Sequence, residues 1–386
     1  MVETLKIGMI SWESIHSIRV GGLAQAVTGM AEGLVDNGHE VHVFTRSEPN
    51  QPDHENINGV HYHRCKFDPY GNIVEHAEKM CRAMSSKVEE LEKKENRFDV
   101  IHGHDWMVAD ALEELQDHDT VMSFHSTEYG RNGGEYGRGR TSHKIRGKEW
   151  LAGYISDKII TVSEAMKNEL QELYEIPPEK ISVVPNGSKA QKIEQEVDPG
   201  KVKERYGIHP LAPMITFLGR MVYQKGPDIM LDAIPNILDY RWDAEFMMVG
   251  DGGMRKYLES KAKQQGISHS TNFPGYVSEK EKLDLLNASD IVCIPSRNEP
   301  FGIVLFEAWA TGNAVIASNV GGLSENIDNF KDGIKASPHP ESIGWSINHV
   351  IDDPRFINRL GKNGRKKSKK FTWENIGRKI QQVYKK

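Results

Sequence analysis

The sequence has few cysteines and no long hydrophobic run. Its three cysteines, Cys65, Cys81 and Cys293, are odd in number and widely separated. They therefore form neither a disulfide framework nor the ligand spacing of a zinc site, and a reducing cytoplasm is the expected setting. No stretch approaches the ~20 apolar residues that a membrane-spanning helix needs. The apolar run after Lys6 ends at Glu13, which is too short for the apolar region of a signal peptide.

A large net charge is also missing. The 49 basic and 55 acidic residues leave a formal net charge of -6, which gives no electrostatic reason to expect nucleic acid as a partner. A lysine-rich run at residues 362–370 has no interleaved aromatic residues. Peripheral membrane contact through this run is therefore not favoured.

The chain of 386 residues is too long for one ordinary core, and we expect two domains of similar size. Apolar runs of strand length alternate with amphipathic stretches of helix length, which is typical of a parallel sheet covered by helices. The fold class is therefore α/β with two sheets. The expected strands are 5–10, 41–45, 60–62, 98–101, 120–124, 158–162 and 181–184 in the first half, and 214–218, 244–249, 271–273, 291–294 and 314–317 in the second.

A turn and a polar stretch separate the two halves. Pro185-Asn-Gly187 and the lysine-rich residues 188–203 have the composition of a linker. At the end of the chain, Thr372 precedes apolar residues at helical spacing, so we expect a terminal helix there.

Two glutamates flank a glycine after an expected strand of the second half. Glu299 lies before a helix and Glu307 inside it, while the amides of Gly302, Ile303 and Val304 lie at the helix start. Unpaired amides and the helix dipole favour a bound phosphate there. Carboxylates accept hydrogen bonds from hydroxyls, so the combination suits a sugar carried on a nucleoside diphosphate. The alternative is a helix with a polar first turn.

Two cations follow another strand of the second half. Arg220 and Lys225 are five residues apart, with glycines at 219 and 226. The guanidinium fork of Arg220 can hold two oxygens while Lys225 supplies a point charge, so the pair can neutralise a departing diphosphate. A surface salt bridge is the alternative.

Two more strands of the second half are followed by loops that contain glycine. One contains Gly250 and the other Tyr276, and both are positioned where they could close on a nucleoside. The strand ends of the first half carry Gly22 and the polar residues His102, His104, Asp105 and His125. Ligands of open parallel sheets bind beyond the carboxyl ends of strands.

The first-half histidines leave a second interpretation open. His102, His104, Asp105 and His125, with the pair at 61 and 63, would suit a metal-dependent hydrolase. That interpretation leaves Arg220, Lys225 and the paired glutamates unexplained.

Taken together, these motifs resemble the retaining glycosyltransferases of family 4, a similarity that extends to the glycogen and starch synthases. The resemblance implies a GT-B fold, in which two Rossmann-like domains face a cleft and the last helix crosses back to the first domain. The domains would comprise residues 1–190 with 372–386, and residues 191–371. The resemblance rests on Gly21-Gly22-Leu23, His104-Asp105-Trp106, His125, Pro185-Asn186-Gly187, Arg220 with Lys225, and Glu299 to Glu307.

On the donor side, the resemblance implies that Arg220 and Lys225 bind the diphosphate with help from the Gly302 loop. Glu299 would contact the transferred sugar and Glu307 the ribose. The transferred group would be a hexose, such as glucose or mannose, and no metal or other cofactor is implied.

On the other wall, the resemblance implies that His125 and Asp105 lie beside the sugar and the acceptor, with Gly22 close to the donor. The acceptor hydroxyl would attack the transferred sugar from the same face that the leaving phosphate departs from. The leaving phosphate would accept the proton of that hydroxyl. Arg19 and Val20 stand where glycogen synthases usually have lysine, so elongation of a glucan is not expected. The sequence does not identify the acceptor; the candidates are the hydroxyl of a saccharide, of a small polyol or of a lipid-linked group.

Overall fold

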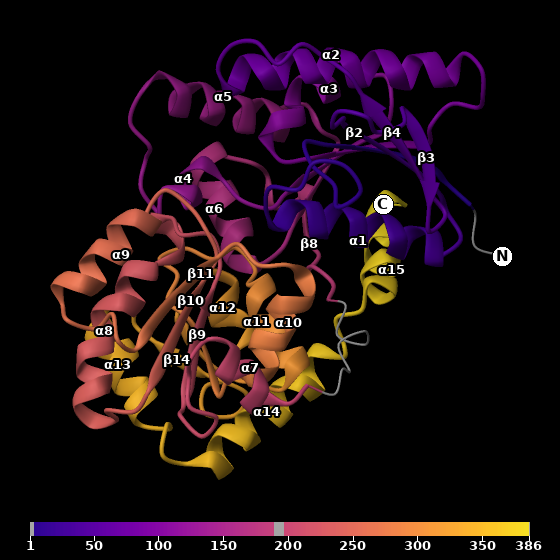
Figure 1. The fold of residues 1–386 in the computed structure, drawn as a ribbon. Helices are drawn as coiled ribbons and strands as arrows, with labels where there is room; N and C mark the ends of the chain where they lie inside the picture. The colour runs from indigo at the N-terminus through magenta and orange to yellow at the C-terminus, as the bar shows by residue number, and fades with distance from the viewer. Residues whose placement is uncertain (1–3, 189–196, 386) are drawn as a thin grey trace. The chain divides into compact units, whose positions relative to one another are not determined.

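The computed structural model describes residues 4–188 and 197–385, and its contacts divide the chain into two compact units. Each unit contains one largely parallel sheet with helices, as the sequence predicts (Figure 1). The expected domain boundary between residues 190 and 191 lies outside the described residues. Unit 1 comprises Met1–Arg131, Glu135–Gly187 and Phe371–Lys386, and unit 2 comprises Asn132–Gly134 and Ser188–Lys370.

The sheet of unit 1 has eight strands, and all neighbouring pairs are parallel except β3 with β4. Most of these strands are buried on both faces, which explains their continuous apolar sequences. The antiparallel β3 was not predicted, because its residues are polar and largely exposed. In spatial order the strands are β3 (His54–Ile57), β4 (Val60–Cys65), β2 (Glu40–Arg46), β1 (Lys6–Ser11), β5 (Val100–His104), β6 (Thr120–Phe124), β7 (Lys158–Thr161) and β8 (Ile181–Val183).

Two helices of unit 1 begin at capping residues. The side chain of Asn72 caps α2 in a capping box with Glu75, and the side chain of Ser163 caps α6. The helices are α1 (Gly22–Asp36), α2 (Ile73–Glu92), η1 (Trp106–Val108), α3 (Ala109–Glu114), α4 (Glu128–Arg131), α5 (Arg140–Ile155), α6 (Glu164–Tyr174), η2 (Pro178–Lys180) and α15 (Trp373–Tyr384).

The final helix, α15, packs on α1 of unit 1 (Figure 1). Glycines permit the close approach: a Cβ on Gly29 would lie 2.1 Å from Cε2 of Trp373. At the other end of α15, the hydroxyl of Tyr384 lies 2.7 Å from Nδ1 of His102 on β5. The predicted terminal helix is confirmed, and it is an integral part of unit 1.

Unit 2 has a six-stranded parallel sheet with a core on each face. Side chains of β10 alternate between two clusters: Phe246 and Met248 join one, and Met247 and Val249 join the other. This period of two is the ordinary geometry of a strand. In spatial order the strands are β11 (Thr271–Gly275), β10 (Glu245–Val249), β9 (Met214–Leu218), β12 (Ile291–Ile294), β13 (Ala314–Ser318) and β14 (Ile334–Ala336).

The helices of unit 2 connect these strands. The predicted linker at residues 188–203 was too long, because α7 already begins at Pro199, where the side chain of Asp198 caps it. The helices are α7 (Pro199–Arg205), η4 (Tyr223–Lys225), α8 (Pro227–Tyr240), α9 (Arg255–Gln264), α10 (Glu279–Ala288), α11 (Ile303–Thr311), α12 (Gly321–Asn326), α13 (Pro340–Asn348) and α14 (Pro354–Ser368).

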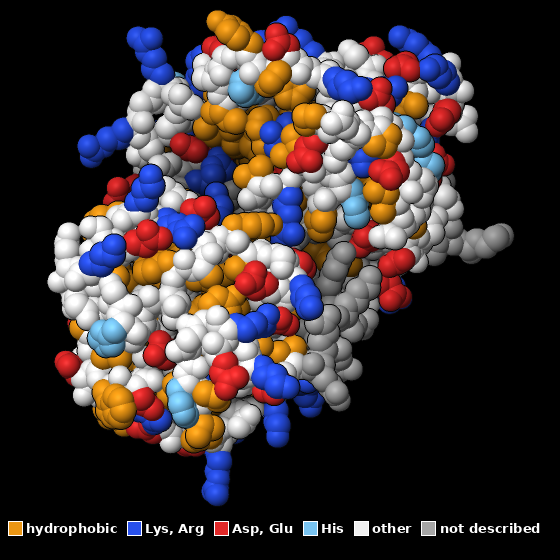
Figure 2. Space-filling model, in the orientation of Figure 1, with side chains coloured by type: hydrophobic (Ala, Val, Ile, Leu, Met, Phe, Trp, Pro, Cys, Tyr) orange, Lys and Arg blue, Asp and Glu red, His pale blue; other side chains and the backbone are white. Residues whose placement is uncertain are grey.

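The surface carries both signs of charge. On the face shown in Figure 2, lysine and arginine side chains are interspersed with acidic ones. That face does not present the continuous basic surface typical of nucleic-acid-binding proteins. Among residues 4–188 and 197–385, no helix combines the length and the apolar character that crossing a bilayer requires.

Candidate functional site

Each sheet has a point at which its strand order reverses. In unit 1 the strand β1 lies between β2 and β5, and in unit 2 the strand β9 lies between β10 and β12. The connections that leave the two adjacent strands run to opposite sides, which opens a crevice where ligands of such sheets bind. The expected site residues follow the strands at these points: Gly22 follows β1 and Asp105 follows β5, whereas Arg220 and Lys225 follow β9 and Glu299 and Gly302 follow β12.

The loop after β1 is shaped by Glu13, a residue that the sequence analysis did not select. Its Oε2 accepts hydrogen bonds from the backbone amides of Val20 (2.5 Å) and Gly21 (2.8 Å). Burial raises the pKa of the Glu13 carboxyl, although these two amides oppose the shift. The contacts hold the loop directly before Gly22, the first residue of α1. In the sequence, Glu13 could have been noticed as a single acidic residue between an apolar strand and the glycine pair.

Asp105 fixes the beginning of the loop after β6. Its Oδ1 accepts hydrogen bonds from the backbone amides of His125 (2.7 Å) and Ser126 (3.3 Å). Asp105 itself has a φ of 59°, an uncommon conformation for a residue other than glycine. The structure therefore brings together Asp105 and His125, as expected from their strand ends.

The histidines of this region are held as neutral rings. Nδ1 of His104 lies 3.2 Å from Nε2 of His125. Burial lowers the pKa of His125 even though Asp105 opposes the shift, and burial also lowers the pKa values of His102 and His104. A neutral imidazole is therefore the form present near pH 7.

The same contacts bear on the metal-dependent alternative. Both ring nitrogens of His102 have protein partners, since Nδ1 meets Tyr384 and Nε2 lies 2.7 Å from Oγ of Ser123. Among the described residues, the group spaced to hold a metal ion is instead Glu40 and His42 of β2 with Glu95, which follows α2. The ammonium of Lys6 already lies 2.8 Å from Oε2 of Glu95 there. The predicted histidine cluster therefore does not converge as a ligand set.

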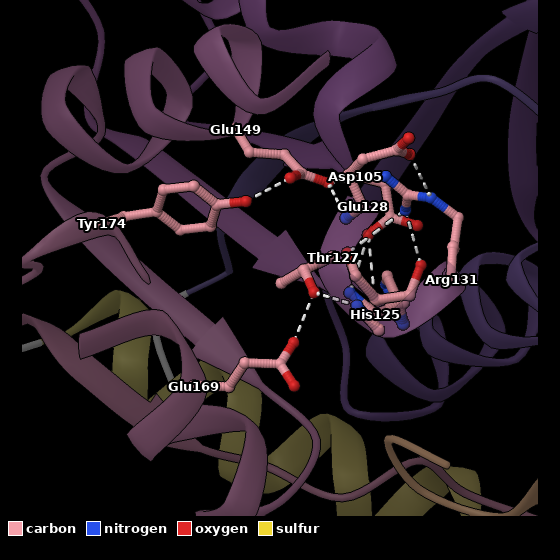
Figure 3. Close-up of polar contacts among 10 residues, drawn as sticks. Asp105, His125, Thr127, Glu128, Arg131, Glu149, Glu169 and Tyr174 are labelled. Atoms are coloured by element: carbon pink, nitrogen blue, oxygen red, sulfur yellow. Dashed lines mark hydrogen bonds and ion pairs between the residues drawn. The ribbon is translucent and has the colours of Figure 1, made fainter. Parts of the chain in front are cut away.

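His125 adjoins a network of polar side chains (Figure 3). It includes the fully buried Glu149 of α5 and Arg131 of α4, whose Nη2 lies 2.6 Å from Oε1 of Glu149. Neither residue was predicted as part of the site: Glu149 belongs to no motif, and Arg131 lies in a glycine-rich, basic segment, 128–140, that was expected to close over the acceptor. Only their meeting in the fold shows that they act together.

In unit 2, Lys225 and Glu299 form an ion pair. Nζ of Lys225 lies 2.7 Å from Oε2 of Glu299, and Oγ of Ser296 donates to the same oxygen at 3.2 Å. The Lys225 side chain is 21% exposed and that of Glu299 is 9% exposed. The two residues come from different strand ends, β9 and β12, so the fold has joined two separately predicted motifs.

A second ion pair braces this arrangement. Nη1 and Nη2 of Arg297 donate to the two carboxylate oxygens of Asp228 at 2.8 Å and 2.6 Å, and Nη1 also reaches the backbone oxygen of Tyr223 at 2.9 Å. Burial raises the pKa of Asp228, but the Arg297 guanidinium outweighs it and the net shift is downward. Arg297 thus ties the turn that carries Lys225 to the loop that carries Glu299. This role of Arg297 was not predicted from the sequence.

Arg220 and the start of α11 remain available for an anion. Arg220 is exposed, and its guanidinium has no hydrogen bond or ion pair within the described part of the chain. Gly302 caps α11 with a φ of 98°, and no side chain caps this helix start. A Cβ at Gly302 would lie 2.8 Å from Cδ2 of Leu323, so both the conformation and the space require glycine. The amides of Ile303 and Val304 follow in the first turn.

Glu307 lies one turn further along α11 and is paired with Lys282 of α10. Nζ of Lys282 is 2.6 Å from Oε1 of Glu307 and 2.8 Å from Oε1 of Glu279. Burial lowers the pKa of Lys282, but the two carboxylates outweigh it and raise the pKa overall. Lys282 therefore keeps its charge and orients Glu307, a contact that the sequence did not indicate.

The two expected nucleoside loops also lie at strand ends. Gly250 has a φ of 129°, and a Cβ there would lie 1.9 Å from the backbone oxygen of Gly219. A side chain at 250 would thus collide with the loop that leads to Arg220. Tyr276 follows β11 and is 74% exposed, so its ring is available to a ligand.

Known proteins resemble the chain over both halves. Residues 20–191 match the family described as Glycosyltransferase Family 4, and residues 201–367 match Glycosyl transferases group 1. An uncharacterized glycosyltransferase of Methanocaldococcus jannaschii is 38% identical over 99% of this chain and 98% of the relative. A glycogen synthase of Mycobacterium tuberculosis is 30% identical over 98% of this chain and 94% of the relative.

Solved structures share the fold. A sucrose-phosphate synthase from Thermosynechococcus elongatus superposes with a TM-score of 0.84 at 22% identity, covering 99% of this chain and 98% of the other. The HepE protein of Anabaena, solved in complex with UDP-glucose, superposes with a TM-score of 0.76 at 18% identity, covering 99% of both chains. These two likenesses show the GT-B fold.

Proposed function

Because the chain belongs to the family 4 glycosyltransferases, we propose that it is a retaining, metal-independent enzyme that transfers a hexose, glucose or mannose, from a nucleoside diphosphate sugar to an acceptor hydroxyl. The cytoplasmic location stays a prediction from the cysteine usage.

One observation carries the donor part of this proposal: the Lys225–Glu299 pair at the strand-order reversal of unit 2. An ammonium and a carboxylate 2.7 Å apart neutralise each other when no ligand is bound. A sugar diphosphate offers a replacement for each partner, because its phosphate oxygens accept from the ammonium and its sugar hydroxyls donate to the carboxylate. Donor binding would then exchange one ion pair for two contacts without leaving a buried charge unpaired.

The same cations would act on the departing group. Negative charge grows on the diphosphate as its bond to the sugar breaks, and fixed cations stabilise that charge with little reorganisation. We assign this role to Lys225 and Arg220, with the amides of Ile303 and Val304 aimed at the same anion. The leaving phosphate takes the proton of the attacking hydroxyl, which accounts for retention without a protein nucleophile.

In unit 1 we assign His125 and Asp105 to the sugar and the acceptor. A neutral imidazole can donate one hydrogen bond and accept another, so it can orient hydroxyl groups without adding charge. Burial lowers the pKa of His125, which favours that neutral form. Asp105 holds the backbone of His125 in place.

The proposal is tested by a thermal-shift screen of ADP-, UDP- and GDP-sugars, followed by mass spectrometry and NMR of the product formed from the best donor. We expect a stabilising shift with one nucleotide class in a buffer containing a chelator, and a product with the anomeric configuration of the donor. A product with inverted configuration would refute the retaining mechanism. Loss of all transfer in chelator, restored by a divalent ion, would refute metal independence.

A further inference from the structure

Glu149 is a carboxylate buried deep within unit 1. It lies on α5, and its exposed fraction is 0%. Removing a carboxylate from water is costly unless donors replace the lost hydration. The fold supplies three: the backbone amide of Glu128 at 2.7 Å from Oε1, Nη2 of Arg131 at 2.6 Å from the same oxygen, and the hydroxyl of Tyr174 on Oε2. These three donors replace the hydration that the carboxylate loses on burial.

The donors lead directly to the proposed catalytic groups (Figure 3). Arg131, held by Glu149, extends Nη1 to within 2.8 Å of Oγ of Ser126. Ser126 follows His125, and the backbone amides of both donate to Oδ1 of Asp105. The segment after β6 is therefore held by Asp105 on one side and by the Glu149–Arg131 pair on the other.

Charges alternate along this path. Although burial alone would lower the pKa of Arg131, Glu149, Asp105 and Glu128 together raise it, so the guanidinium stays charged. Burial raises the pKa of Glu149 to about 7, against the opposing effects of Arg131 and Tyr174. If Glu149 lost its negative charge, the Arg131 guanidinium would interact with only two acidic neighbours, Glu128 and Asp105.

We propose that Glu149 is a positioning residue for sugar transfer: through Arg131 it holds the turn that presents His125 against Asp105. This inference rests on the proposed roles of His125 and Asp105. Glu149 does not touch the reacting groups. A side chain displaced by about 1 Å from its productive position can cost roughly 100-fold in rate, so an indirect contact can still have a large effect.

The first test is the isosteric variant Glu149→Gln, which keeps the volume and removes the charge. We expect kcat to fall roughly 10- to 100-fold while the KM for the donor changes less than about threefold, because the groups proposed to bind the diphosphate and the ribose lie in unit 2. The matched control is Tyr174→Phe, which removes one hydrogen bond and keeps the Glu149–Arg131 pair. Its kcat at pH 8 should stay within about threefold of the wild type. A wild-type kcat in Glu149→Gln would overturn the inference.

The pH profile of kcat gives an independent readout. The charged and titratable groups that face Glu149 are Glu128 and Arg131 on α4 and Tyr174 on α6, with Asp105 beyond Arg131. Activity should decline as the pH falls below about 7, and this limb should be absent in Glu149→Gln. In Tyr174→Phe the limb should move to higher pH, because the hydroxyl of Tyr174 lowers the pKa of Glu149. An acid limb that persists unchanged in Glu149→Gln would contradict the positioning role.

A double variant separates positioning from stability. Removing one charge of a buried pair is destabilising, whereas replacing both by neutral groups is often tolerated. Glu149→Gln combined with Arg131→Gln should therefore recover thermal stability without recovering kcat. Recovery of kcat together with stability would mean that Glu149 matters only for folding.

A final readout does not depend on activity. The imidazole of His125 can be observed by NMR in protein labelled at histidine with nitrogen-15, and His125→Asn identifies its signals. We expect these signals to shift in Glu149→Gln and to change little in Tyr174→Phe. If the wild type transfers no sugar, the proposed function fails while this measurement still decides the structural link. Unchanged His125 signals in Glu149→Gln would refute that link.

Discussion

The polar groups at the strand-order reversal of unit 1 are bound to one another, whereas at that of unit 2 Lys225 and Glu299 form an ion pair that a ligand can exchange. In unit 1, Asp105 accepts from two backbone amides, and His102 and His104 are buried, which lowers their pKa values and keeps them neutral. In unit 2, Lys225 and Glu299 meet in a partly exposed pair, and Arg220 is exposed. The polar groups of unit 1 are therefore held in fixed positions, whereas the charges of unit 2 can be redirected to a ligand.

This difference matches two chemical tasks. Binding a diphosphate requires charge that is present before the ligand arrives but can be redirected to it, which an exchangeable ion pair provides. Orienting hydroxyl groups requires donors and acceptors held at fixed positions, which the hydrogen-bonded network of unit 1 provides.

Removing the ammonium of Lys225 should cause the largest loss of activity. Lys225→Ala should lower kcat by roughly two to three powers of ten, because stabilisation of the departing diphosphate is lost. The matched control is Lys201→Ala, which removes an exposed lysine of α7 whose Nζ lies 3.7 Å from Asp198. Steady-state kinetics of both variants would decide. A Lys225→Ala enzyme as fast as the control would contradict the assignment.

Neutralising the partner of Lys225 should separate transfer from nucleotide binding. Glu299→Gln should reduce kcat by about 100-fold while the Kd for the free nucleoside diphosphate stays within about threefold. The reason is that Glu299 contacts the sugar and not the phosphate in the proposed complex. Calorimetry with the nucleoside diphosphate and kinetics with the full donor would be compared. Equal losses in both would give Glu299 a structural role instead.

Acid should destabilise unit 1 more than unit 2. Every buried histidine among the described residues lies in unit 1. Burial lowers the pKa values of His63 and His102 from 6.5 to about 3, and that of His104 also falls. Below about pH 6.5 these histidines become protonated in the unfolded chain but stay neutral in the folded chain. The free energy of unfolding therefore falls as the pH drops from about 6.5 toward 3.

Each of these histidines should cost roughly 1 kcal/mol between pH 7.5 and 5.5. Hydrogen exchange monitored by mass spectrometry at the two pH values would resolve the units. We expect faster exchange at pH 5.5, corrected for the intrinsic rate, in the strands of unit 1. A larger change in unit 2 would refute the explanation.

The smallest effect is expected at Lys282. Lys282→Met removes the cation that orients Glu307, and we expect the KM for the donor to rise a few-fold, with a loss of roughly 1–3 kcal/mol in the free energy of unfolding. The comparison variant is Lys261→Met, which removes the cation that lies 2.7 Å from Asp232 on α8. A donor KM that rises equally in both variants would show that the Glu307 contact is not specific.

Most of the sheet organisation could be predicted from apolar runs, because strands buried on both faces have continuous apolar sequences. The runs at 120–124, 214–218 and 291–294 coincide with β6, β9 and β12. The polar β3 and the three-residue β14 were missed because neither has such a run.

The candidate site was predictable where a motif follows a strand, as with Asp105 and Lys225. Supporting residues were not, because their partners are distant in sequence. Glu149 meets Arg131 and Tyr174, 18 and 25 residues away, and Arg297 meets Asp228, 69 residues away. Such pairs arise from the packing of helices and loops, which no local pattern records.

The exchange of the Lys225–Glu299 pair can be measured directly in a crystal structure of the protein with the nucleoside diphosphate sugar that gives the largest thermal shift. We predict that Nζ of Lys225 leaves Oε2 of Glu299, now 2.7 Å away, and lies within hydrogen-bonding distance of a diphosphate oxygen while Glu299 accepts from the sugar. A bound donor beside an intact Lys225–Glu299 pair would contradict the account.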